Sequence, residues 1–264
     1  MNNFQKACIE IYSEEILETK PQEGYIFMRN LNWVKIKYHS IDGLVVVDGD
    51  IILGLEQDLI KNESFFDSKD ISFEAIIYDP IDVVKWPNKT IYYSIDPDFP
   101  NKERIEIAIK HWEDKTFMKF VERTNEMNYV YFVSAKGCSS RIGMVGGKQE
   151  IRLSNKCHWG TVVHEIAHAI GFWHEQARED RDNYVTIHLE NVKLGTEYNF
   201  KQRITHGKDV GTYDYSSIMH YGKYAFSKNG KSTIEPKDPE VKIGQRKSLS
   251  IKDIQALNTI YSYK

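Results

Sequence analysis

Three histidines at fixed spacing constrain this chain more than any other feature of its sequence. His164 and His168 lie four residues apart in a segment that reads as a helix, TVVHEIAHAIGFWHEQ, and His174 follows. Residues four apart share one helix face about one turn apart, so two imidazoles can meet one Zn²⁺ at ~2.0–2.1 Å. The bare H-E-x-x-H pattern also occurs in unrelated helices with two solvated histidines, so it does not establish a metal site by itself.

The residues after the second histidine favour the metal site. Gly171 follows His168 by three positions, and a glycine beyond a helix end can take a positive φ and reverse the chain. The reversal would return His174 to the metal, and three neutral imidazoles leave a position open for water, as catalytic zinc sites do. Glu165 is then placed to take a proton from that water and pass it to a leaving amine. The segment therefore predicts one catalytic Zn²⁺, with His164, His168 and His174 as ligands and Glu165 as the general base.

This extended pattern, H-E-x-x-H-x-x-G-x-x-H, is that of the metzincin metalloproteases, and two further segments resemble the astacin family of peptidases. One of these segments is YDYSSIMHY at residues 213–221, which resembles the Met-turn of the family. The resemblance covers about 190 residues, from Ala75 to the end, and its motifs are among the more specific that a sequence offers. The other segment directly follows the third histidine and comprises Glu175, Arg178, Asp180, Arg181 and Asp182.

The resemblance implies an α+β fold of the metzincin/astacin type. We expect a twisted, mostly parallel sheet with an active-site helix and a C-terminal helix, above a lower half with little regular structure. The resemblance also implies that Met219 forms a hydrophobic floor beneath the zinc ligands. Tyr221 would ligate zinc in the resting enzyme and then swing to stabilise the oxyanion. Each residue has a plainer alternative, an ordinary core methionine and a packed tyrosine with a satisfied hydroxyl.

Local patterns predict where these elements lie. Ser250 and Asp253 form a capping-box pattern that opens a last helix. Its expected inward residues are Ile251, Ile254, Leu257 and Tyr261. Another helix is predicted by apolar residues at helical spacing, namely Ile105, Ala108, Ile109 and Trp112. Runs rich in β-branched and aromatic residues predict sheet strands at 91–95, 119–122, 129–133 and 151–153.

Residues 1–74 read differently from the remainder. Short β-rich runs at 25–28, 33–38 and 44–47 alternate there with Asp-Gly turn signals. Because astacins are made as zymogens, the resemblance implies that residues 1–74 are an inhibitory pro-segment of small β-rich structure and that residues 75–264 are the catalytic domain. Cleavage near Ala75, by an activating protease or by the chain itself, would free an α-ammonium that reaches Glu175 in a buried ion pair.

Two residues of this pro-segment compete for the open zinc position. Asp50, in VDGDI, resembles the pro-segment motif of the family, whose aspartate caps the zinc. Cys8 is the odd thiol if Cys138 and Cys157 form a disulfide, a pairing that the resemblance implies, and a thiolate is a strong zinc ligand. The motif favours Asp50 and coordination chemistry favours Cys8, so both are candidates.

Composition excludes several classes of partner. Lys and Arg number 35 against 38 Asp and Glu, for a net charge of −3, so we expect no nucleic-acid partner. The apolar runs are far shorter than the ~20 residues of a membrane-spanning helix, so we expect no membrane span. The start, MNNFQKACIEIYSEE, lacks the apolar core of an export signal. The chain is therefore either cytosolic or shown without its signal peptide, and the disulfide and the family favour secretion.

These observations predict a secreted zinc metalloendopeptidase of the astacin type, present as a bacterial-type proenzyme and expected to be a monomer. Its substrates would be proteins and peptides, bound as an extended strand along the sheet edge over the cleft. One alternative is a zinc-stabilised binding module without catalysis, which the presence of a general base disfavours. A second is a metal-dependent hydrolase of non-peptide substrates.

Overall fold

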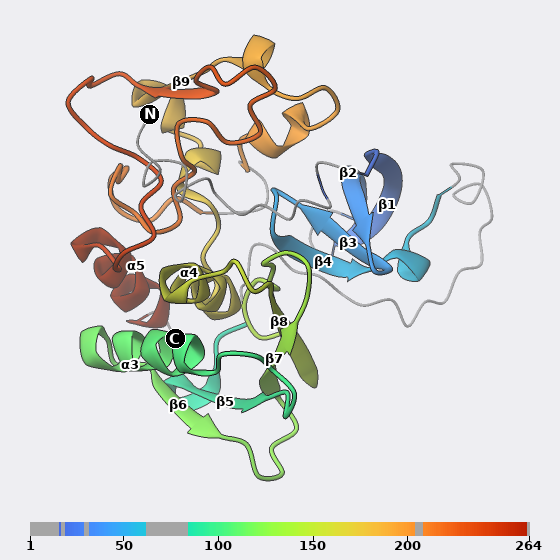
Figure 1. Cartoon of the computed structure of the whole chain (residues 1–264), viewed down its shortest axis with the longest axis vertical. Helices are drawn as coiled ribbons and strands as arrows, with labels where there is room; N and C mark the ends of the chain where they lie inside the picture. The colour runs from blue at the N-terminus through green and yellow to red at the C-terminus, as the bar shows by residue number, and fades with distance from the viewer. Residues whose placement is uncertain (1–15, 17–18, 29–31, 62–83, 204–207, 263–264) are drawn as a thin grey trace.

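A computed structural model describes residue 16 and residues 19–28, 32–61, 84–203 and 208–262. Its described part has two sheets of four strands, one two-stranded sheet and three α-helices, joined by short 3₁₀ turns (Figure 1). The 3₁₀ turns are η1 (Glu56–Asp58), η3 (Pro87–Lys89), η4 (Glu175–Ala177), η5 (Arg181–Asn183), η6 (Leu189–Asn191) and η7 (Glu197–Phe200). None of the described helices is long and apolar enough to span a bilayer.

The larger body is built on a parallel sheet in the order β6-β5-β7-β8. Its strands are β5 (Thr90–Ile95), β6 (Lys119–Glu122), β7 (Tyr129–Ser134) and β8 (Lys148–Leu153). The expected strands are all present, but β8 begins three residues earlier than its apolar run. The first residues of β8 are polar, so a search for β-branched and aromatic residues does not find them. Gln149 is nevertheless buried there, and its amide donates to the Gly143 carbonyl at 2.9 Å.

Two helices pack together on this sheet, α3 (Glu103–Lys115) and α4 (Trp159–Ile170) (Figure 1). The predicted inward stripe of α3 is confirmed, since all four of its residues are buried. Trp112 donates its indole N–H to the Val163 carbonyl at 3.2 Å, which fixes α3 against α4. A buried disulfide joins Cys138 to Cys157, as expected.

The last helix, α5 (Ile251–Ser262), begins with the predicted capping box. The Ser250 amide donates to the Asp253 carboxylate at 2.9 Å, and the Asp253 amide donates to the Ser250 hydroxyl at 2.9 Å. Leu257 is buried as expected, but the expectation for Ile251 is wrong because its side chain is 77% exposed. In the first turn the inward position belongs to buried Asp253, and a residue two positions away on a helix faces the opposite side.

The amino-terminal part forms an antiparallel sheet of β1 (Gln22–Met28), β2 (Asn32–Ile41), β3 (Leu44–Val47) and β4 (Ile51–Leu55). The three expected β-rich runs are confirmed as strands. Asp48 and Gly49 both have positive φ, 48° and 85°, and turn the chain between β3 and β4. We call residues 48–50 the hairpin tip. It points toward the larger body, where the amino-terminal sheet lies beside β8 (Figure 1).

The segment between α4 and α5, here called the lower segment, has little regular structure, as expected. Within it β9 (Val185–Ile187) pairs antiparallel with β10 (Ile234–Pro236). Many of its apolar residues form one core cluster with residues of the amino-terminal sheet. This shared core includes Ile41, Val46 and Ile52 from the sheet and Val185, Phe200, Tyr221 and Phe226 from the lower segment.

Candidate functional site

Four buried side chains converge where the hairpin tip meets α4. Asp50, His164, His168 and His174 each offer one ligand atom, and these atoms all lie within 4.8 Å of one another. The Asp50 carboxylate is 3.2 Å from His164 Nε2, 3.4 Å from His168 Nε2 and 3.1 Å from His174 Nε2. The structure therefore brings together the three histidines that the spacing selected and one of the two candidates from residues 1–74.

Helix geometry explains how the histidines meet. His164 and His168 lie one turn apart on α4, with ring centroids 4.7 Å apart. The helix ends at Gly171, whose φ of 128° is accessible to glycine and strained for other residues. Its amide bonds back to the carbonyls of Ala167 and His168 at 3.0 and 2.8 Å. The chain then reverses and places the His174 ring 4.8 Å from that of His168.

Hydrogen bonds to the far ring nitrogens aim two of the imidazoles. His164 Nδ1 is 2.8 Å from the Ile218 carbonyl, and His168 Nδ1 is 2.7 Å from the Phe172 carbonyl. Because a carbonyl only accepts, each Nδ1 donates, and the neutral ring then turns a lone pair on Nε2 toward the cluster. This second layer of contacts is typical of histidines that bind metals.

The same group of atoms fits a divalent metal ion. Among the described residues, His168 Nε2, His174 Nε2 and Asp50 Oδ1 are buried without a hydrogen-bond partner, which would cost free energy in a metal-free site. Three imidazole nitrogens and a carboxylate oxygen are the donors that Zn²⁺ binds in a tetrahedral arrangement. The chemistry of the donors and the orphaned atoms therefore agree.

Local electrostatics favours the protonation states that metal ligands need. Burial, aided by the positive charge of Arg246, holds the pKa of His164 well below its usual value, and burial also lowers the pKa of His174. Burial alone would raise the pKa of Asp50, but its contacts with the three histidines, above all His174, hold it well below its usual range. Neutral imidazoles beside an ionised carboxylate are the state that a divalent ion selects.

Glu165 lies beside His164 on α4 and is 1% exposed. Its Oε2 has no hydrogen-bond partner among the described residues. Burial raises its pKa well above the ordinary value, and the nearby charge of Asp50 raises it further. The buried site and the charge of Asp50 therefore both disfavour the ionised form of this carboxyl.

Tyr221 and Met219 are both buried, but the structure gives them different surroundings. The Tyr221 hydroxyl donates to the carbonyl oxygen of Asp48 in the hairpin tip at 2.5 Å, so it binds the amino-terminal sheet instead of joining the four-group cluster. Its ring centroid lies 4.7 Å from that of His174. Met219 belongs to the core cluster of the larger body, and its carbonyl accepts from the Glu175 amide at 3.2 Å.

An ion pair that sequence reasoning missed holds the hairpin tip. The Asp48 carboxylate, 1% exposed, accepts from Arg203 Nε at 2.8 Å and also from a second nitrogen of the same guanidinium. The Arg203 amide donates to the Ala177 carbonyl at 2.7 Å, so its main chain is anchored close to the third histidine. The only sequence signal at Asp48 is an Asp-Gly turn, and no signal connects it to an arginine 155 residues away.

The backbone of the hairpin tip also extends the edge of the parallel sheet. Ser139 exchanges backbone hydrogen bonds with Arg152 of β8, at 3.0 and 2.9 Å. On its other side, Ser140 donates to the Asp50 carbonyl at 2.9 Å and accepts from the Ile52 amide at 2.8 Å. Residues 50–52 therefore occupy the place of an added strand directly beside the four-group cluster.

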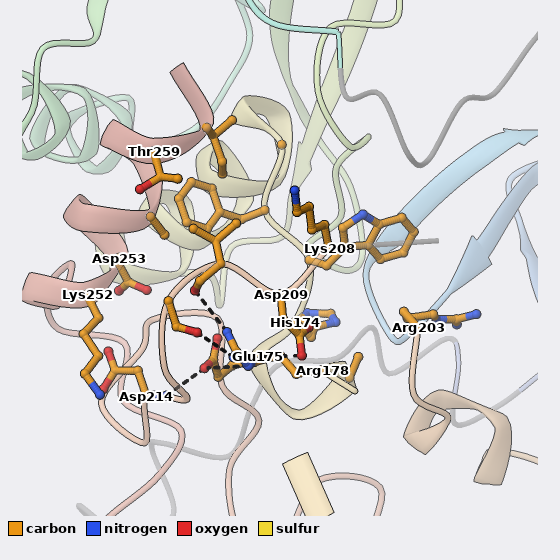
Figure 2. A pocket seen from close by; sticks show the side chains of 18 of the residues that line it. His174, Glu175, Arg178, Arg203, Lys208, Asp209, Asp214, Lys252, Asp253 and Thr259 are labelled. Carbon is orange, nitrogen blue, oxygen red and sulfur yellow. Dashed lines mark hydrogen bonds and ion pairs between the residues drawn. The ribbon is translucent and has the colours of Figure 1, made fainter. Parts of the chain in front are cut away.

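A separate cavity of about 410 Å³ opens beside Glu175 (Figure 2). Glu175 accepts from the Asp214 amide at 2.7 Å and lies 3.7 Å from Arg178 Nε. Burial raises its pKa to about 8, although Arg178 opposes this. Figure 2 shows Lys252, Asp253 and Thr259 of α5 along one wall of the cavity. Cys8 and Ala75, the other residues named for latency and for the new amino terminus, lie outside the described residues.

Comparison with known proteins identifies relatives of this chain. A family model described as Astacin, a peptidase family, matches residues 81–262. Zinc metalloproteinase nas-13 of Caenorhabditis elegans is 41% identical over 185 residues, which cover 68% of this chain and 41% of that protein. Blastula protease 10 of Paracentrotus lividus is 38% identical over 230 residues, or 81% of this chain and 38% of that protein. The chain thus spans about two fifths of the length of these two relatives.

Two further relatives match over most of their own length. Astacin-like metalloprotease toxin 1 of Loxosceles intermedia is 38% identical over 235 residues, covering 84% of this chain and 87% of that protein. That share of the chain is larger than residues 81–264 can supply, so the matched region begins before residue 81. The solved structure of High choriolytic enzyme 1, a hatching enzyme zinc-protease of the medaka Oryzias latipes, superposes with a TM-score of 0.61 at 40% identity. It covers 68% of this chain and 94% of that one.

Proposed function

Because the chain belongs to the astacin family, we propose that it is a zinc-dependent endopeptidase that hydrolyses peptide bonds of protein substrates. The observation that carries this proposal is the convergence of His164, His168 and His174 on one point, with two of the rings aimed by carbonyl groups. Glu165, the adjacent residue on the same helix, supplies a buried carboxyl for proton transfer.

Each residue of the site would have a separate role in peptide hydrolysis. His164, His168 and His174 would hold Zn²⁺, which supplies Lewis-acid chemistry to a peptide carbonyl. Glu165 accepts a proton from the attacking water and delivers it to the leaving nitrogen. An extended substrate pairs with Ser140, where residues 50–52 now bind. Once its hydroxyl leaves Asp48, Tyr221 donates a hydrogen bond to the oxyanion.

We further propose that residues 1–74 are a pro-segment that keeps the enzyme latent. Asp50 takes the position that a substrate carbonyl or water needs, and Asp48 removes Tyr221 by accepting its hydroxyl. The match to the Loxosceles intermedia toxin, which begins before residue 81, supports a shared segment ahead of the catalytic domain at 75–264. Asp50 is our choice of zinc-capping residue because it lies in the cluster. Cys8, the other candidate, lies outside the described residues.

The last step of activation would be binding of the new amino terminus in the cavity beside Glu175. We propose that cleavage near Ala75 creates an α-ammonium that enters this cavity and pairs with the Glu175 carboxylate. A carboxyl whose pKa burial has raised to about 8 lacks a sufficient counter-charge, and an arriving cation would supply one. The third zinc ligand, His174, directly precedes Glu175, so this ion pair would form next to the zinc site.

We also propose that the enzyme acts outside the cell. The buried disulfide between Cys138 and Cys157 supports this, because disulfides form and persist in oxidising compartments. Two relatives are described as a toxin and as a hatching enzyme zinc-protease, names that suit export.

The decisive test replaces the proposed general base. Glu165→Gln in the activated chain should lower kcat for a peptide substrate by about 10²–10⁴-fold, because the proton acceptor is lost. Its zinc content should stay at one ion per chain, since Glu165 is not a ligand. Glu150→Gln, a partly exposed glutamate on β8, is the matched control and should hydrolyse normally. Zinc binding without hydrolysis by the unmodified activated chain would favour a binding module, and cleavage of non-peptide substrates alone would favour the other alternative.

A further inference from the structure

A buried glutamine holds the main chain of Tyr221. Gln176 Oε1 accepts a hydrogen bond from the Tyr221 amide at 3.1 Å, and the glutamine is 1% exposed. The two residues are 45 positions apart, so this contact joins the turn after the third histidine to the end of the Met-turn segment. Within the described residues, the amide nitrogen of Gln176 has no partner, so the acceptor contact to Tyr221 is the bond that fixes this side chain.

The backbone of Gln176 is itself held on both sides. Its carbonyl accepts from Arg181 at 3.0 Å, and the same guanidinium nitrogen reaches the Phe200 carbonyl at 2.5 Å. One residue earlier, the Glu175 amide donates to the Met219 carbonyl at 3.2 Å. Two hydrogen bonds therefore connect residues 175–176 to residues 219–221, and buried Arg181 braces the turn that supplies them.

The main-chain carbonyl of Tyr221 also has a hydrogen-bond partner. His220 Nδ1 lies 2.7 Å from the Tyr221 carbonyl, and His220 Nε2 lies 2.6 Å from the Tyr213 hydroxyl. The amide and the carbonyl of Tyr221 are thus both fixed, while its hydroxyl bonds to the hairpin tip. When that tip leaves, the phenol can rotate about side-chain bonds while the point from which it swings stays in place.

From these contacts we propose that Gln176 is a positioning residue that fixes the main chain of Tyr221 so that its hydroxyl reaches the oxyanion. This inference rests on the proposed endopeptidase function and on the role proposed for Tyr221. The physical reason is that an oxyanion donor works only within a narrow range of distance, about 2.7–3.1 Å, so movement of the main chain misplaces it. Loss of the acceptor would also leave a buried N–H unsatisfied, and the segment would shift to hydrate it.

The test is a double-mutant cycle with a matched control. Gln176→Met removes the acceptor at similar length and volume, and Gln149→Met makes the same change at another buried glutamine that accepts a backbone N–H, from Val145 at 3.1 Å. Each change is made alone and together with Tyr221→Phe. The full chains are activated by limited proteolysis, and kcat and KM are measured on one peptide.

We expect Gln176→Met alone to lower kcat by about 10- to 100-fold, with KM changed by less than about twofold. Added to Tyr221→Phe, the same change should cost less than about threefold, because the hydroxyl that it positions is already absent. Gln149→Met should show no such coupling to Tyr221→Phe. A merely structural role for Gln176 would instead give the same fractional loss in both backgrounds.

A second measurement does not depend on catalysis. In the uncleaved, ¹⁵N-labelled chain, the Tyr221 amide should exchange its hydrogen about 10-fold faster or more in Gln176→Met, and at an unchanged rate in Gln149→Met. Unchanged exchange together with unchanged kcat would overturn the inference, as would equal losses in the two backgrounds. If the unmodified activated chain hydrolyses no peptide, the proposed function fails and the positioning role fails with it. If Tyr221→Phe alone is without effect, the role of Tyr221 is the part that is wrong.

Discussion

At the scale of single residues, Glu175 stands out because its carboxyl is largely withdrawn from water beside a cavity and lacks a full counter-charge. Its pKa of about 8 means that folding requires it to hold a proton that the unfolded chain would release above about pH 4.5. Below the unfolded pKa the group does not oppose folding. As pH rises from the unfolded value to about 8, the folded state becomes progressively less stable, and above that the effect is constant.

Glu175→Gln should therefore stabilise the uncleaved chain increasingly as pH rises from about 5 to 8. The difference in the free energy of unfolding between variant and unmodified chain should grow by up to ~1.4 kcal/mol per pH unit and then level off. Denaturant unfolding across this pH range measures it. In the activated chain the new α-ammonium would stabilise the ionised carboxylate, so there the variant should be the less stable one. A difference independent of pH in the uncleaved chain would contradict the assignment.

At the scale of elements, the hairpin between β3 and β4 carries two aspartates with separate partners. Asp50 meets the histidines, while Asp48 binds Arg203 through its carboxylate and Tyr221 through its carbonyl. An arginine fork on a buried carboxylate is a strong contact, and removing one partner leaves the other charge buried. The Asp48 to Arg203 pair should therefore contribute to latency independently of Asp50.

Asp48→Asn should raise peptide hydrolysis by the uncleaved chain about 10-fold or more, because the hairpin tip is held less tightly. Activity is measured before any cleavage and normalised to that of the fully activated sample. Asp42→Asn is the matched control. Asp42 also pairs with an arginine of the larger body, Arg152, but its side chain is 53% exposed, and exposed pairs contribute little. Equal effects of the two variants would contradict a special role for Asp48.

The first turn of α5 holds the segment that contacts His164. The Asp253 carboxylate accepts from the Ser217 hydroxyl at 2.7 Å and from the Ile218 amide at 3.0 Å, and the Ile218 carbonyl orients His164. Asp253 therefore caps the helix and fixes the segment that orients His164 with the same carboxylate.

Asp253→Ala should lower the free energy of unfolding by about 2–4 kcal/mol and weaken zinc binding about 10-fold. Ser250→Ala removes the capping hydroxyl alone and should cost about 1 kcal/mol with little change in zinc affinity. Denaturant unfolding and competition with a zinc chelator of known affinity measure the two quantities. Similar zinc affinities in the two variants would show that Asp253 acts only as a cap.

Sequence reasoning succeeds where one local segment contains the whole signal. The spacing of His164, His168, Gly171 and His174 predicts the helix, its end and the convergence of the rings, and the capping box predicts the start of α5. It fails where partners come from distant segments of the chain, as for Asp48 with Arg203, or where a polar residue takes an inward position, as Asp253 does in place of Ile251. Hydrophobic periodicity contains no information on such polar contacts.

At the scale of the whole molecule, the two parts of the chain are joined by a shared core and by the four-group cluster. Ile41, Val46 and Ile52 pack in one cluster with Phe200 and Tyr221 of the lower segment. The proposed zinc ion would add a link, because Asp50 comes from the amino-terminal sheet and the histidines come from the larger body. Metal binding should therefore stabilise the assembly of both parts as well as the site.

Removal of zinc with a chelator should lower the melting temperature of the uncleaved chain by about 5–10 °C. In Asp50→Ala the shift should be smaller, since one ligand and the link between the two parts are already lost. Calorimetry with and without chelator gives both values. The same shift in the two proteins would mean that Asp50 does not bind the ion.

The order of the groups along the chain has a consequence for biosynthesis. Asp50 precedes His164 by 114 residues, so a ribosome completes the hairpin tip well before the histidines emerge. With the latency proposed for residues 1–74, the cell that makes this protein would never have to handle a nascent catalytic centre without its cover. The timing of proteolysis would then be separated from the timing of translation.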